Sequence, residues 1–122
     1  KEIAYIHAEG YAAGEMKHGP IAMIDPGVAT VAIAVQGKTY DKVISNMQEV
    51  RARKGRIIAI ANEDDTEIEA LAEYVIRVPR TYNFFGPIVN SIPLQLLAYY
   101  MALARGADVD QPRNLAKSVT VE

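Results

Sequence analysis

The chain has 122 residues, of which 50 % are hydrophobic and 23 % charged, and its formal net charge is −2. This is the composition of an ordinary soluble domain that is long enough to bury a core. No basic patch stands out, so a nucleic-acid-binding function has no electrostatic support. No apolar run approaches the ~20 residues that a membrane-spanning helix needs, so no membrane partner is expected.

The content of cysteine and histidine restricts the chemistry further. The sequence has no cysteine, which excludes disulfides and thiolate metal sites and fits a cytoplasmic protein. The two histidines, His7 and His18, are too few to suggest a metal site. We therefore expect neither a metal nor another cofactor.

The first 18 residues are predicted to form a helix, because Ile3, Ile6, Gly10 and Ala13 recur at three- and four-residue steps. The helix should end at His18, since Gly19 suits a positive backbone angle and a proline follows. Position 1 is not methionine, and the predicted helix begins at the first residues. We therefore expect a piece of a longer polypeptide.

The middle of the chain alternates between apolar runs and helical patterns. Three runs are predicted as strands, at 28–35, 57–61 and 74–78. Their apolar residues do not alternate with polar ones, which is typical of parallel strands buried on both faces. Three further segments are predicted as helices, at 40–54, 66–73 and from about 87 or 91 to 105. The pattern predicts an α/β fold, a three-layer α/β/α sandwich around a parallel sheet.

Local details complete this prediction. Residues 25–27 are expected to form a turn, and the acidic residues 62–65 are expected to form a solvated loop. Thr66 and Glu69 fit a capping box for the short helix that follows. The last helix is apolar on nearly every side, so it should be buried on more than one side. Pro93 should either begin this helix or kink it, and Gly106 should end it.

Residues 110–122 fit neither an amphipathic helix nor an alternating strand, yet they contain several apolar residues. Pro112 interrupts regular structure, and Lys117 lies among small residues. A surface lysine is the ordinary interpretation of Lys117. The alternative is an amine in a partly apolar pocket, where desolvation lowers the pKa and the neutral amine can attack a carbonyl.

Both ends of the chain resemble a known family. The tail 109–122, the segment 92–100 before it, and the segments 1–9 and 14–20 resemble the glucosamine-6-phosphate synthases, which are glutamine:fructose-6-phosphate amidotransferases. The motif Glu-x-Lys-His-Gly-Pro at 15–20 is typical of sugar isomerase (SIS) domains in general, and the tail narrows the resemblance to the synthases. This implies a flavodoxin-like SIS subdomain over 1–106 and a tail at 107–122 that covers an active site.

The resemblance also implies roles for four residues. Lys117 would form a Schiff base with open-chain fructose-6-phosphate, and Ala116 and Lys117 would bind this substrate. Glu2 would move the proton between C1 and C2, which suits a carboxylate with a raised pKa. His18 would assist ring opening in the neighbouring subunit, which implies a homodimer. Glu2 and His18 also have ordinary interpretations. Glu2 can be a solvated acid at a helix start, and His18 can be a helix cap.

The chain lacks parts that the family's reaction needs. The sugar-phosphate pocket of the family depends on serine- and threonine-rich loops of a preceding SIS subdomain, whereas the serines here are Ser45, Ser91 and Ser118. The glutaminase domain is also missing from these residues. We therefore expect both domains as partners and no turnover by this chain alone. A non-catalytic, sugar-phosphate-binding regulatory SIS module and a purely structural domain are the alternative hypotheses.

Overall fold

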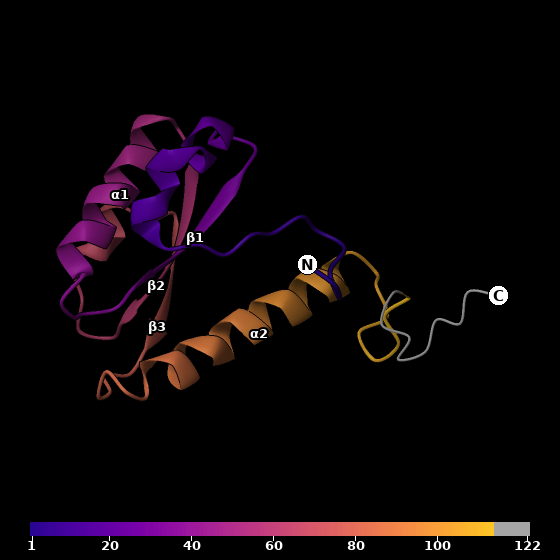
Figure 1. The fold of residues 1–122 in the computed structure, drawn as a ribbon. Helices are drawn as coiled ribbons and strands as arrows, with labels where there is room; N and C mark the ends of the chain where they lie inside the picture. The colour runs from indigo at the N-terminus through magenta and orange to yellow at the C-terminus, as the bar shows by residue number, and fades with distance from the viewer. Residues whose placement is uncertain (114–122) are drawn as a thin grey trace. The chain divides into compact units, whose positions relative to one another are not determined.

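The computed structural model describes residues 1–113 and divides them between two compact units. The larger unit is Tyr11–Asn90, and the smaller unit joins Lys1–Gly10 to the chain from Ser91 onward. The larger unit contains a parallel sheet in the order β1 (Ala29–Ala34), β2 (Arg56–Asn62) and β3 (Tyr74–Val78) (Figure 1). The α/β fold class with a parallel sheet is thus confirmed.

Helix α1 (Tyr40–Ala52) packs against β1 and β2. The strands present alanine to this helix: Ala32 pairs with Ala59, and Ala34 with Ala61. Small side chains let the helix approach the sheet closely. The helix turns one apolar side to the core, since Met47 and Val50 are buried and Val43 and Ile44 pack against the same core.

Gly55 is the last residue of the connection between α1 and β2, and it is closely surrounded by other side chains. A Cβ atom there would lie 2.5 Å from Ile24 Cγ2 and 2.7 Å from Val50 Cγ1. The residue with the left-handed backbone angle is Lys54, with a φ of 62°, rather than this glycine. Gly55 is therefore explained by close packing, because any side chain there would clash with Ile24 and Val50.

The helix predicted over residues 1–18 is wrong. Residues 2–5 form a turn, no helix follows until the 3₁₀ helix η1 (Ala13–His18), and a second 3₁₀ helix, η2 (Pro20–Met23), comes directly after it. Gly10 and Gly14 weaken any helix here, because each glycine costs about 1 kcal/mol relative to alanine. The predicted end at His18 is confirmed, and Gly19 has a φ of 142°.

The expectation that all strands are buried on both faces is also wrong. Val31 and Ile33 of β1 are 37 % and 43 % exposed, and Tyr74 of β3 is 59 % exposed. All three lie on the sheet face opposite to the alanines that face α1. The residues of the larger unit therefore cover this second face only incompletely.

The final helix, α2 (Gly86–Ala104), includes Pro93 within its length, and Gly106 follows it with a φ of 68°. Within its own unit, Ile92, Leu96 and Tyr100 are all at least half exposed, and its predicted burial stays a prediction. With 19 residues and a hydropathy of 1.2, α2 is long and apolar enough to cross a membrane, although the sequence suggested no such segment. A core helix of a soluble protein meets the same criterion.

Candidate functional site

Glu2 and the beginning of the tail belong to the same unit. Glu2 is exposed in the turn at residues 2–5, and it makes no side-chain hydrogen bond or ion pair to the residues that the structure describes. Three residues later, the hydroxyl oxygen of Tyr5 accepts a hydrogen bond of 2.9 Å from the backbone N–H of Arg113. The turn that carries Glu2 and the start of the tail are therefore joined although 108 residues separate Tyr5 from Arg113.

His18 lies at the end of η1 in the other unit. Met16 anchors this short helix in the core, and Lys17 pairs with Glu49 of α1 at 3.2 Å. The His18 side chain is 72 % exposed, and its Nδ1 lies 2.8 Å from the Glu15 carboxylate. The helix is thus fixed by one buried side chain and one ion pair, while the imidazole remains open to solvent beside a carboxylate.

Lys117 and Ala116 lie outside the described residues. Of the residues with proposed roles, the structure thus describes Glu2 and His18, each within its own unit. The other histidine, His7, is exposed, and its Nε2 lies 3.6 Å from the Glu9 carboxylate.

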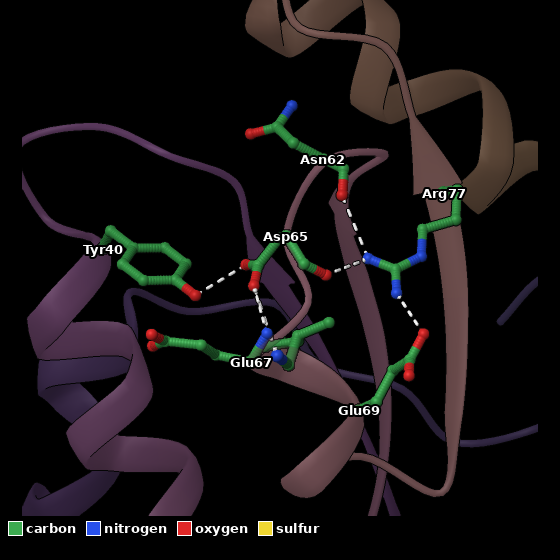
Figure 2. Close-up of polar contacts among 7 residues, drawn as sticks. Tyr40, Asn62, Asp65, Glu67, Glu69 and Arg77 are labelled. Carbon is green, nitrogen blue, oxygen red and sulfur yellow. Dashed lines mark hydrogen bonds and ion pairs between the residues drawn. The ribbon is translucent and has the colours of Figure 1, made fainter.

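The carboxyl ends of the strands, where open parallel sheets commonly bind ligands, carry a buried polar network that sequence reasoning missed. Asp65 is 6 % exposed and accepts three hydrogen bonds: from the Tyr40 hydroxyl at 2.6 Å and from the backbone N–H groups of Glu67 and Ile68 at 3.1 and 3.2 Å (Figure 2). The acidic loop is therefore only partly solvated. Asp65, rather than Thr66, thus accepts from the backbone at the start of the short 3₁₀ helix η3 (Ile68–Ala70), whose N-cap residue is Glu67.

Arg77 and Asn62 extend this network across the ends of the strands. Arg77 donates to the backbone oxygens of Asn62 and Asp65 and forms an ion pair of 2.6 Å with Glu69 (Figure 2). The Asn62 side chain accepts from the backbone N–H of Gln36 at 2.8 Å, which ties the loop after β1 to the end of β2. Among residues 1–113, no buried side-chain nitrogen or oxygen lacks a partner.

The network changes the acidity of Tyr40. Burial, together with the hydrogen bond to Asp65 and the charge of that carboxylate, raises the pKa of Tyr40 to about 12. The phenol therefore stays neutral at physiological pH and remains a donor to Asp65. Since the carboxylate already accepts three hydrogen bonds from its own chain, this network is suited to holding the loops in place rather than to binding a ligand.

A pocket of about 260 Å³ lies at the opposite, amino-terminal ends of β2 and β3. Its two arginines already have partners. Arg51 donates to the backbone oxygen of Ala70, and Arg56 forms two hydrogen bonds of 2.8 Å with the Glu73 carboxylate. The charges that line this pocket are therefore engaged within the chain itself.

Comparison with known proteins decides the family. The model of the SIS domain matches residues 1–105. The chain belongs to the SIS domain family. This domain is also present in a solved structure entitled C-terminal domain of glucosamine-fructose-6-phosphate aminotransferase from Francisella tularensis, which matches with a TM-score of 0.78 and 39 % identity over 88 % of this chain and 30 % of that one.

Curated relatives of this SIS chain are named glutamine–fructose-6-phosphate aminotransferase (isomerizing). The protein from Thermus thermophilus is 62 % identical over all 122 residues, and that from Chlorobaculum tepidum is 60 % identical over the same length. The chain spans 20 % of the length of each of these relatives. The similarity therefore includes the tail with Lys117, while most of each relative lies outside the region matched.

Proposed function

We propose that this chain is the C-terminal isomerase portion of an enzyme that makes glucosamine-6-phosphate from fructose-6-phosphate and glutamine-derived ammonia. The observation that carries the proposal is the 62 % identity to the glutamine–fructose-6-phosphate aminotransferase of Thermus thermophilus over the full 122 residues, tail included. The motif at 15–20 is typical of SIS domains, and the family model matches the chain over residues 1–105. Membership of this sugar isomerase family supports a sugar-phosphate substrate.

In the proposed reaction, the neutral amine of Lys117 attacks C2 of open-chain fructose-6-phosphate, and water leaves as the Schiff base forms. Ala116 lines the substrate beside it. His18 moves the proton that opens the sugar ring, a task suited to a group that titrates near neutral pH. Ammonia then adds to C2 and the Lys117 amine leaves, after which Glu2 takes a proton from C1 and returns it to C2, giving the 2-amino aldose.

This proposal includes partners. The sugar phosphate is held mainly by a preceding SIS subdomain, and ammonia comes from a glutaminase domain of the same polypeptide. His18 serves the active site of a second copy, so the working form is a homodimer. The enzyme is cytoplasmic. Within the chain, 1–106 is the SIS subdomain and 107–122 is the covering tail.

Trapping the Schiff base tests the proposal. Borohydride delivers hydride to the imine carbon and leaves a stable secondary amine, so the full-length protein treated with fructose-6-phosphate should carry one sugar adduct on Lys117. Lys117→Arg should abolish the adduct, because a guanidinium stays protonated and cannot attack a carbonyl. Lys38→Arg is the control and should label normally. A wild-type protein that binds the sugar without labelling would instead support a non-catalytic regulatory SIS module.

A further inference from the structure

The chain after α2 follows a course set by local hydrogen bonds. Gly106 and Ala107 donate to backbone oxygens of the last helical turn at 2.9 and 3.0 Å, which ends the helix in the manner of a glycine cap. The Asp108 carboxylate then accepts from the backbone N–H groups of Asp110 and Gln111 at 2.9 and 3.0 Å. These bonds bend the chain before Pro112 fixes the next backbone angle.

The tail reaches Tyr5 immediately after this bend. The backbone N–H of Arg113 donates to the Tyr5 hydroxyl at 2.9 Å, and the Arg113 guanidinium carbon lies 4.3 Å from the centre of the Tyr5 ring. The side chain thus stacks its cation on the aromatic face while the backbone bonds to the hydroxyl. We call this pair of contacts the tail anchor. It uses both the ring and the oxygen of Tyr5, which no other residue type supplies together.

Tyr5 has a strained backbone. Its φ is 51°, a left-handed angle that a bulky residue rarely adopts. Such strain persists where surrounding contacts enforce it, and it is concentrated at functional sites. Among the contacts of Tyr5 in residues 1–113 are both parts of the tail anchor, so the strained turn presents its side chain where the tail begins.

Two residues with proposed roles are close in sequence to the residues of the tail anchor. Glu2 precedes Tyr5 by three residues, and Lys117 follows Arg113 by four. Four residues of fully extended chain span at most about 14 Å. Glu2 and Lys117 are therefore each separated from the tail anchor by only a few residues of chain.

We propose that Tyr5 is a positioning residue for the Schiff-base step, and that it acts through Arg113 on the segment that carries Lys117. This inference rests on the proposed function. Tyr5 itself performs no chemistry; it limits the positions that the tail can occupy, so that the amine meets the sugar carbonyl beside Glu2. Reaction rates depend steeply on such placement, whereas the sugar phosphate is bound mostly by other residues.

The test measures adduct formation at Lys117 in the full-length protein over a range of fructose-6-phosphate concentrations. Tyr5→Leu removes both parts of the tail anchor and should lower the saturating labelling rate by about tenfold or more, with little change in the half-saturating concentration. Tyr5→Phe keeps the ring and Arg113→Ala keeps the backbone bond, so each should have a smaller effect in the same direction. Tyr82→Leu makes the same change at a residue that is 83 % exposed and should label as wild type.

The outcomes separate the two proposals. If the wild type labels and all three anchor variants label at the wild-type rate, the positioning role of Tyr5 is refuted while the proposed function stands. If the wild type itself forms no adduct, the proposed function fails and the positioning role fails with it. Should Tyr5→Leu not fold, Arg113→Ala decides, because Arg113 is exposed and we expect its truncation to leave the fold intact.

Discussion

The polar groups at the carboxyl ends of the strands differ from those at the start of the chain in one respect: whether the fold already uses them. Asp65 is buried and accepts three hydrogen bonds from its own chain. Glu2 is exposed without a side-chain partner among the described residues, and His18 is 72 % exposed beside Glu15. The buried carboxylate of Asp65 is therefore structural, whereas Glu2 and His18 retain the capacity to meet a substrate.

The largest expected effect concerns Glu2. In the full-length protein, Glu2→Gln should lower product formation by about a hundredfold or more, because an amide cannot move the proton between C1 and C2. Adduct formation at Lys117 should continue, since it precedes that proton transfer. The control is Glu9→Gln, which alters an exposed acid in the same segment. Normal turnover by Glu2→Gln would remove this residue from the mechanism.

Asp65 tests the structural side of the comparison. Asp65→Ala leaves the Tyr40 hydroxyl and two backbone N–H groups without their acceptor, so the free energy of unfolding in urea should fall by about 3 kcal/mol. Asp64→Ala is the matched control, because Asp64 forms an exposed ion pair of 2.6 Å with Arg80 and should cost less than about 1 kcal/mol. Equal losses of unfolding free energy in Asp65→Ala and Asp64→Ala would contradict a structural role for Asp65 that Asp64 lacks.

Gly55 sharpens the comparison with a position that carries no charge. Gly55→Ala forces a methyl group against Ile24 and Val50 and should destabilise the protein by about 1–3 kcal/mol. Gly37→Ala places the same methyl group where no atom lies within 4 Å, and it should have almost no effect. Urea denaturation of both variants checks the difference, and a stable Gly55→Ala would contradict the close packing seen here.

Tyr40 gives a smaller effect that depends on pH. Its pKa rises from 10.0 to about 12 in the folded protein, so its stabilising contribution is complete below pH 10 and is lost as the pH rises toward 12. Tyr40→Phe removes this ionisation and should cost about 1 kcal/mol at neutral pH. Between about pH 9 and pH 11, the urea midpoint of unfolding should fall more for the wild type than for Tyr40→Phe. An equal fall of the urea midpoint in the wild type and in Tyr40→Phe would refute the raised pKa of Tyr40.

The sheet could be predicted because its signal is local. The runs that became β1, β2 and β3 are apolar without alternation, and α1 has a regular apolar side. The helix over 1–18 could not be excluded, because its periodic apolar residues outweighed Gly10 and Gly14 in the pattern. The structure keeps only a 3₁₀ turn around the buried Met16.

The candidate site could be predicted only in part. Glu2, His18, Ala116 and Lys117 came from the resemblance of the chain's ends to a family, and their roles remain proposals. Asp65 was missed because its partner Tyr40 lies 25 residues away, and the surrounding acids suggested a solvated loop. An aspartate two to three residues before a short helix, where its side chain can accept from the backbone of the first turn, was the signal. Tyr5 and Arg113 are 108 residues apart, so no local pattern connects them.

The most direct test of the division between structural and reactive groups is the amount of borohydride-trapped sugar on Lys117 in folded, full-length Asp65→Asn and Lys117→Arg. We predict that Asp65→Asn labels like the wild type, despite a lower stability, and that Lys117→Arg does not label. A folded Asp65→Asn that binds fructose-6-phosphate but forms no adduct would place Asp65 in the reaction and contradict this account.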